Sequence, residues 1–238
     1  MTAAERCATA ILSLALHNRA SHVLVEPVED AVEVFEIREG QRVLTLRAAR
    51  ELHGALIDCF KAMAGIREPG QRVGELTLED ADRQIPISVA TGVAEHGERL
   101  VAHLHSSENP LRLSALLKLA EDESIGRCVK AFLAGALARQ TSEVRIEGDG
   151  GVLQVRYQAD GGRFEPLMEE PLSILLHAPV VARLKQMAGH DLLDFGRALC
   201  GHFLVDYEGK KVQVLVSVNP AEQGSENVVL RFSGAGVV

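Results

Sequence analysis

The stretch RCATAILSLALHNRASHVLVEPVEDAVEVFEIREG, residues 6–40, aligns without a gap with RCVKAFLAGALARQTSEVRIEGDGGVLQVRYQADG, residues 127–161. The pairs that are identical at this offset of 121 residues include Ser21 with Ser142, Val23 with Val144, Glu26 with Glu147, Val34 with Val155, and Gly40 with Gly161. After a three-residue insertion in the second copy, Met63-Ala64-Gly65 aligns with Met187-Ala188-Gly189. Farther on, Gly74 aligns with Gly201, and residues 94–97 align with 221–224. Because the matches keep one order along both copies, the sequence predicts two tandem copies of one module.

Each copy has the pattern of a helix and three strands, repeated once, so the predicted order is αβββαβββ. Helical spacing of apolar residues marks residues 4–18 and 124–139, and later about 48–64 and 171–188. Gly65 and Gly189 follow the later helices, where a helix C-terminus favours glycine. Period-two alternation marks strands at 22–26, 32–37, 72–78, 84–91 and 100–104, and at 143–147, 153–158, 163–166, 201–207, 211–218 and 228–232. We therefore expect an α+β fold with helices packed mainly on one face of a mixed or antiparallel sheet.

A helical linker is expected between the copies. The predicted organisation is a first module over residues 1–105, the linker over 106–123 and a second module over 124–238. Asn109 would cap the linker helix, with Pro110 in its first position. Its apolar residues form a candidate interaction surface: Leu111, Leu113, Leu116 and Leu117. The alternative, that this helix packs between the two copies, stays open.

Composition excludes several classes of partner. The net charge of −8 gives no general attraction to phosphate backbones or anionic membranes, and 4% aromatic residues with no Trp leave few stacking platforms. The apolar run Ala8–Leu16 follows Glu5 and lacks the basic flank of a signal peptide. No apolar run reaches the length of a membrane span. We expect a cytoplasmic protein that binds neither nucleic acid nor membrane.

The four cysteines indicate free thiols. Cys7, Cys59, Cys128 and Cys200 form no C-x-x-C pair and no zinc spacing, and three of them lie in apolar runs. Buried free thiols in a reducing compartment are the expectation.

Catalytic motifs are missing from the 238 residues. There is no G-x-x-x-x-G-K-[ST] loop and no G-x-S-x-G elbow. His103 and His105 share a strand face without a third ligand and are read as part of a solvated face. Cys200 and His202 lack an orienting group, and Glu26 with Glu147 is read as a solvated or turn-capping carboxylate. We expect no catalytic residue, no cofactor and no metal.

Three segments of the second copy carry a family resemblance. TSEVRIE at 141–147, VRYQADG at 155–161 and RLKQMAG at 183–189 resemble A-S-D-I-H-I-E-P, V-R-Y-R-I-D-G and R-L-K-x-M-A-G. These are motifs of the N-terminal domain that precedes the motor domain in type II secretion and type IV pilus assembly ATPases. The first copy preserves the first motif better, as ASHVLVEP at 20–27, and residues 221–231 resemble the closing segment of that domain. The resemblance covers nearly the whole chain, once per copy.

The resemblance also implies what each copy has lost. In the family this PAS-like domain resembles a lid that supplies two arginines toward ATP. Those places hold Glu75 and His202 for the first arginine, and Ser88 and Leu215 for the second. We therefore expect a non-catalytic protein-interaction or regulatory adaptor without ATP hydrolysis, which binds itself or components of secretion, pilus or motility machinery. The alternative is a small-ligand sensor for a nucleotide or metabolite, since PAS-like folds enclose pockets.

Overall fold

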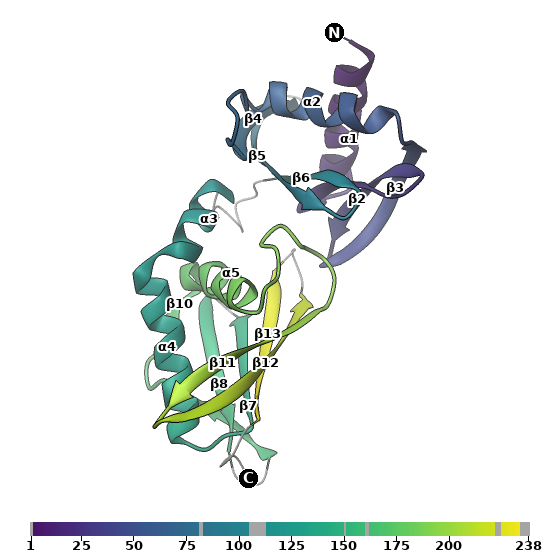
Figure 1. Ribbon diagram of the computed structural model, residues 1–238. Helices are drawn as coiled ribbons and strands as arrows, with labels where there is room; N and C mark the ends of the chain where they lie inside the picture. The colour runs from purple at the N-terminus through teal and green to yellow at the C-terminus, as the bar shows by residue number, and fades with distance from the viewer. Residues whose placement is uncertain are drawn as a thin grey trace. The chain divides into compact units, whose positions relative to one another are not determined.

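The chain forms two compact units, Met1–Ala115 and Leu116–Val238, in a computed structural model (Figure 1). The structure describes residues 2–80, 83–104, 113–149, 151–159, 162–221 and 225–233. The boundary between the units falls within the stretch expected as the linker. Each unit is described by itself below.

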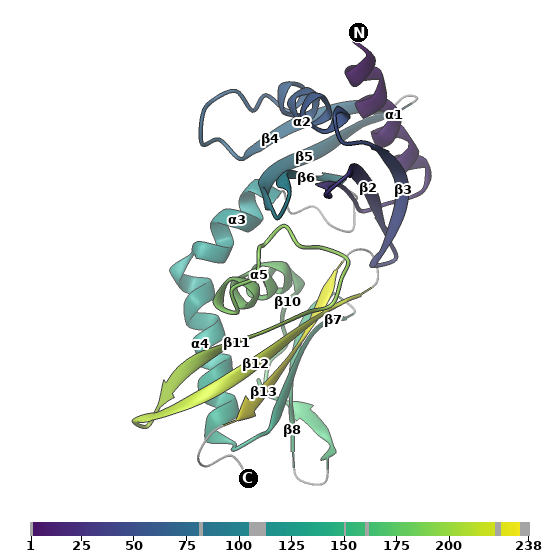
Figure 2. The same cartoon turned by 45° about the vertical axis from the view of Figure 1, so that its right-hand side comes forward.

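The first unit is an antiparallel sheet covered by two helices. The strand order is β3-β2-β1-β6-β5-β4, so the first strand of the unit, β1, pairs with its last strand, β6, at the centre of the sheet. Figure 2 shows both helices on the same side of this sheet. The elements are α1 (Ala3–His17), β1 (His22–Pro27), β2 (Ala31–Arg38), β3 (Gln41–Ala49), α2 (Leu52–Met63), β4 (Val73–Asp80), β5 (Arg83–Ala94) and β6 (Gly97–Leu104).

Side-chain alternation places the core of the first unit between sheet and helices. Thr2 caps α1 through a capping box with Glu5, which fixes where the helix begins. Leu12 of α1 and Phe60 of α2 are fully buried in one cluster with Val23, Val25, Ile87 and Val89 from the strands. The strand residues of this cluster are two apart, as one face of a sheet requires.

The second unit repeats this arrangement with additional short elements. Its strand order is β10-β8-β7-β13-β12-β11, with β9 paired to β8, and its core joins Phe132 of α4 and Leu184 of α5 to Ile146 and Val214 of the sheet. Leu204 and Leu215 are exposed. Helix α3 (Leu113–Glu121) contains the boundary between the units. The elements of the second unit after it are α4 (Glu123–Ala138), β7 (Glu143–Asp149), β8 (Val152–Gln158), β9 (Phe164–Pro166), β10 (Leu172–Ser173), η2 (Ile174–Leu176), α5 (His177–Met187), β11 (Leu199–Tyr207), β12 (Lys210–Pro220) and β13 (Glu226–Ser233).

The α+β class is confirmed, with antiparallel sheets, but the predicted starts of both second helices are wrong. Strand β3 continues to Ala49 because residues 41–49 pair with β2, so α2 begins four residues later than expected, at Leu52. In the second unit Leu172 and Ser173 pair with β8, and Ser173 caps a short 3-10 turn, so α5 begins at His177. Non-local pairing overrides the helical spacing at both places.

The ends of these helices are as predicted, and the strands approach them closely in both units. Gly65 and Gly189 have positive φ angles of 70° and 78° directly after the helix caps. A Cβ atom on Gly74 would lie 2.2 Å from the carbonyl oxygen of Ala64, and one on Gly201 would lie 2.6 Å from that of Ala188. Both glycines therefore let a strand pass directly against the end of the second helix.

No helix in the described ranges combines the length and the apolar character that crossing a membrane requires.

Candidate functional site

A lysine and a glutamate form a buried ion pair in the second unit. The Lys185 ammonium, in the last turn of α5, lies 2.8 and 2.6 Å from the two carboxylate oxygens of Glu226 at the start of β13. It also donates to the carbonyl oxygen of Asp194 at 2.6 Å. The two charged side chains are only 1% and 7% exposed. Lys185 thus has a partner for each of its three donor hydrogens.

The segment between α5 and β11 closes over this lysine. The Phe195 ring centroid lies 4.7 Å from the ammonium nitrogen, a cation–π contact, and the Asp194 carboxylate pairs with Arg197 at 2.8 Å. Burial lowers the pKa of Lys185 and raises the pKa of Glu226, while the attraction between the two groups opposes both changes. The ion pair, the Asp194 carbonyl and the Phe195 ring therefore stabilise the charged forms and offset the free energy that desolvation costs.

A histidine completes the cluster. His177, in the first turn of α5, is buried and makes a hydrogen bond with the backbone of Glu226. Burial holds the pKa of His177 below its ordinary value. His177 and Lys185 are eight residues apart, which places them on one face of the helix about two turns from each other.

The first unit has the same three residue types in the same places. Lys61, in the last turn of α2, pairs with Glu98 of β6 at 2.5 Å, and a ring nitrogen of His53 lies 2.7 Å from the Glu98 carbonyl oxygen. His53 and Lys61 precede His177 and Lys185 by 124 residues, the offset at which Met63-Ala64-Gly65 aligns. We call each set the His-Lys-Glu cluster of its unit.

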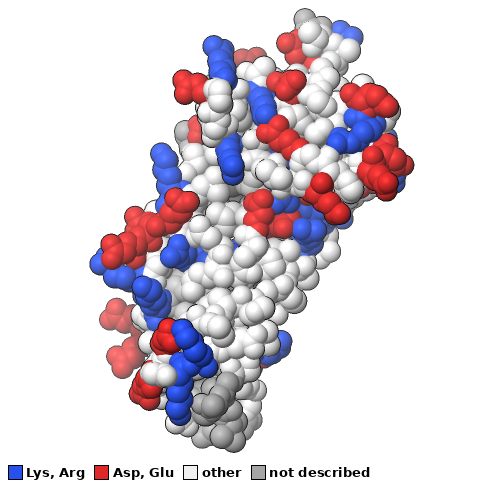
Figure 3. Space-filling view, in the orientation of Figure 1, with Lys and Arg blue, Asp and Glu red and all other residues white. Residues whose placement is uncertain are grey.

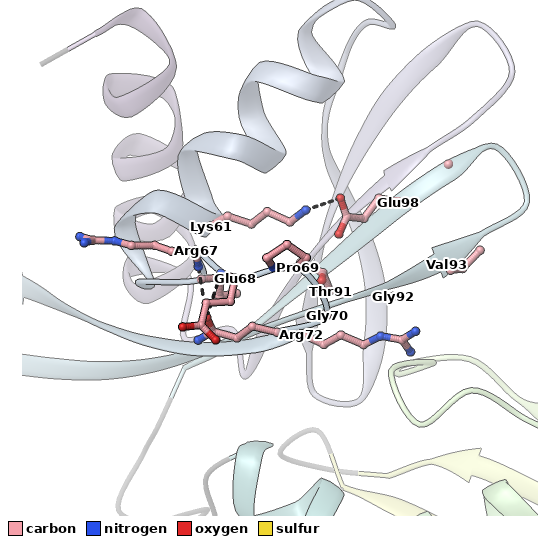
Figure 4. Close-up of a pocket in the computed structure, with 13 residues that line it drawn as sticks. Lys61, Arg67, Glu68, Pro69, Gly70, Arg72, Thr91, Gly92, Val93 and Glu98 are labelled. Carbon is pink, nitrogen blue, oxygen red and sulfur yellow. Dashed lines mark hydrogen bonds and ion pairs between the residues drawn. The ribbon is translucent and has the colours of Figure 1, made fainter.

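The two clusters differ in what covers the lysine. Lys61 and Glu98 are 26% and 39% exposed, and they border a pocket of about 590 Å³ (Figure 4). A further three residues are inserted in the second copy between Gly189 and Gly201, where the offset rises from 124 to 127, so the first unit has a shorter connection here. Around the pocket are Lys61, Ile66, Arg67, Glu68, Pro69, Gly70, Gln71, Arg72, Thr91, Gly92, Val93, Gly97 and Glu98.

The predicted leucine surface stays a prediction. Leu111 lies outside the described residues, and Leu113 opens α3 but its side chain lies outside them too. Leu116 and Leu117 are half-buried in α3.

The positions to which the sequence resemblance assigns two arginines are brought together in both units. Glu75 on β4 lies directly opposite Ser88 on β5, and His202 on β11 lies directly opposite Leu215 on β12. Cross-strand partners have adjacent side chains on one face of the sheet. In each unit the two positions, which come from separate sequence segments, are therefore neighbours on one face of the sheet, and neither position holds an arginine.

Several expectations about polar side chains and thiols are corrected. His103 is buried rather than solvated, because it stacks on His22 with ring centroids 4.6 Å apart; His105 lies outside the described residues. Glu26 is neither solvated nor a turn cap, because Arg42 binds its two oxygens at 2.9 and 3.1 Å. Of the four free cysteines only Cys59 is buried, while Cys7 and Cys200 are exposed.

The described residues contain no candidate metal site. His, Cys, Asp and Glu side chains there form no group of three or more placed to hold a metal ion. Acidic and basic side chains are interspersed on the face shown in Figure 3. Motif reasoning missed the His-Lys-Glu clusters, which occur at corresponding places in both units.

The comparisons relate this chain to secretion and pilus assembly ATPases. Type II secretion system protein E of Pseudomonas aeruginosa is 30% identical over 203 residues, which cover 84% of this chain and 39% of that protein. The protein of the same name from Klebsiella pneumoniae is 31% identical over 140 residues, 59% of this chain and 27% of that protein. Type IV pilus assembly ATPase PilB of Myxococcus xanthus is 27% identical over 141 residues, which cover 59% of this chain and 24% of that protein. The matched residues span between 24% and 39% of the length of these three relatives. No family model matches the chain.

Acidification is expected to destabilise the second unit through His177. The folded-state pKa of this group lies below the ordinary 6.5, so the unfolded chain takes up a proton that the folded chain resists. Stability is fully present above pH 6.5 and falls as the pH drops below it, by at most about 1.4 kcal/mol per pH unit for one proton. Urea unfolding of the wild type and of His177→Gln, at about pH 7.5 and pH 5.5, measures the effect. The variant should lose less stability than the wild type on acidification, and the exposed-site control His202→Gln should lose as much. Equal losses in all three proteins would contradict the assignment.

Proposed function

We propose that this chain is a non-catalytic protein-interaction or regulatory module, related to the N-terminal domains of secretion and pilus assembly ATPases. The observation that carries the proposal is which residues occupy the two paired strand positions where the family resemblance places the arginines of an ATP lid. Glu75 with Ser88 and His202 with Leu215 occupy that place. A glutamate, a serine, a histidine and a leucine supply no fixed positive charge for a triphosphate.

The two units are proposed to be degenerate tandem copies of one PAS-like module. Three features support the duplication: the order of elements, the contact of Gly74 and Gly201 with the preceding helix end, and the His-Lys-Glu cluster. The copies have kept the scaffold and lost the arginines, so the proposed function rests on the surfaces that the units present. Partners of the proposed module are components of secretion, pilus or motility machinery, or a second copy of the chain.

A combined activity and co-purification experiment tests this function. The purified chain is expected to release phosphate from ATP no faster than a buffer blank, because the 238 residues hold no P-loop. A tagged chain recovered from its native cells should bring down a secretion, pilus or motility component, identified by mass spectrometry. Turnover of ATP would refute the non-catalytic part. A monomer in solution that recovers none of these components would refute the interaction part.

A small-ligand sensor is the second candidate, and the pocket beside Lys61 is the observation that favours it. A volume of about 590 Å³ lies in the range of ligand sites. Nucleotides and metabolites can be screened by thermal unfolding, since a ligand at a hundredfold excess over its Kd adds about 2.7 kcal/mol of stability.

A further inference from the structure

The second unit shows what a His-Lys-Glu cluster binds when it is filled. There the chain supplies its own occupant, Asp194-Phe195, from the segment that follows α5. The carbonyl oxygen of Asp194 accepts from the lysine ammonium at 2.6 Å, and the Phe195 ring lies over the same nitrogen at 4.7 Å. An acidic residue followed by an aromatic residue thus covers the lysine and leaves it 1% exposed.

The first unit has the same cluster without this cover. Among the residues that the structure describes, Lys61 has one hydrogen-bond partner, Glu98, although its ammonium group has three donor hydrogens. The Lys61 side chain is 26% exposed and lines the pocket, so the pocket is the side from which a ligand would approach it. Lys61 and Glu98 lie at one end of the group of lining residues, joined by their ion pair, as Figure 4 shows.

The lining of the pocket suits an acidic and aromatic ligand. Ile66 and Pro69 supply apolar surface from the connection between α2 and β4, and Val93, which is 77% exposed, supplies more from β5. An aromatic ring gains most of its binding energy from such surface. The lining includes three basic side chains, Lys61, Arg67 and Arg72, and two acidic ones, Glu68 and Glu98, so its net charge favours an acidic group.

We propose that the pocket beside Lys61 is a docking site for a partner-protein segment in which an acidic residue precedes an aromatic one. The segment takes the position that Asp194-Phe195 takes in the second unit, with a backbone carbonyl on the Lys61 ammonium and the ring over it. This inference rests on the proposed interaction function and specifies the partner chemistry at one site. One unit is closed by its own chain, and the other is open to another protein.

A peptide with the chain's own sequence tests the proposal. The probe is a fluorescein-labelled HDLLDFGRA, residues 190–198, and its binding to the full chain is measured by fluorescence anisotropy. Saturable binding is expected, and a peptide with Phe195→Ala should bind at least about tenfold more weakly, because the ring and its contact with the ammonium are lost. Failure to bind up to millimolar concentration, or equal binding of the two peptides, would overturn the proposal.

Three protein variants locate the binding. Lys61→Gln should weaken it about tenfold by removing a charged donor. Val93→Glu should weaken it as well, because it places a like charge beside the acidic residue at an exposed position where the fold tolerates the change. Lys130→Gln, an exposed lysine of α4 in the second unit, is the matched control and should bind as the wild type does. Unchanged affinity in both pocket variants would exclude this pocket as the site.

Competition separates this proposal from its alternatives. Unlabelled peptide should displace the probe, whereas inorganic phosphate or ATP at the same concentration should not. Displacement by phosphate or ATP alone would overturn the peptide proposal in favour of a small-ligand site. If the tagged chain recovers its partner equally well with Lys61→Gln, the interaction function stands and the pocket is not its site.

Discussion

Replacing Lys185 with methionine is expected to lower the free energy of unfolding of the second unit by about 3–5 kcal/mol. The change leaves the Glu226 carboxylate 7% exposed and without its ammonium partner, while the neighbouring Asp194 also raises the pKa of Glu226. The carboxyl then takes up a proton on folding, so the loss is smallest at low pH and grows as the pH rises above the ordinary glutamate value of 4.5. Both tyrosines of the chain, Tyr157 and Tyr207, belong to the second unit, so tyrosine fluorescence during urea unfolding measures this loss.

The first unit provides a matched control for this prediction. Lys61→Met breaks an ion pair of the same residue types whose carboxylate is 39% exposed, so we expect a loss under about 1 kcal/mol, measured by circular dichroism. A second control, Lys185→Met with Glu226→Leu, removes both buried charges and should recover most of the lost stability. Equal losses for Lys185→Met and Lys61→Met would show that burial does not distinguish the two clusters.

The sheets and their order of elements were predictable because the signal is local. Val23 and Val25, which alternate in the sequence, lie on one buried face of the sheet in the structure. Gly65 and Gly189 have the positive φ angles expected after a helix. Period and turn chemistry are properties of neighbouring residues, so one sequence suffices to find them.

The boundaries that failed depend on partners distant in the chain. Residues 48–51 and 171–176 have helical spacing of apolar residues. In the structure, however, Ala48 and Ala49 pair with β2, and Leu172 and Ser173 pair with β8, so these residues form strands. The burial of His103 depends in the same way on His22, which lies on a neighbouring strand. A pattern within one segment contains no information on such pairings.

The His-Lys-Glu clusters were missed because their members are far apart and fit no motif. Lys185 and Glu226 are 41 residues apart, and no catalytic or metal spacing relates them. One signal was present, since His53 with Lys61 and His177 with Lys185 keep the offset of the Met-Ala-Gly match. The three additional residues between Gly189 and Gly201 were also visible in the sequence, but only the structure shows that the longer connection covers the lysine.

Gly74→Ala and Gly201→Ala are expected to destabilise their units by about 1–3 kcal/mol or more. The new Cβ atoms would lie 2.2 Å from the Ala64 carbonyl oxygen and 2.6 Å from the Ala188 carbonyl oxygen, distances at which the strand or the helix end must move. Gly74→Ala should cost more because its contact is shorter and because the Glu75 amide donates to the same Ala64 oxygen at 3.1 Å. Urea unfolding, followed by circular dichroism for the first unit and by tyrosine fluorescence for the second, measures both losses.

Gly54→Ala is the matched control for these substitutions. Gly54 lies in α2 with no atom within 4 Å of an added Cβ, so the same change of residue there should stabilise the helix by about 0.5–1 kcal/mol. If the free energy of unfolding rises in Gly54→Ala and falls in Gly74→Ala, the same chemical change has opposite effects within one unit. The loss at Gly74 would then be assigned to the contact between β4 and the end of α2. A loss at Gly54, or none at Gly74 and Gly201, would contradict the close approach of strand and helix that both units have in common.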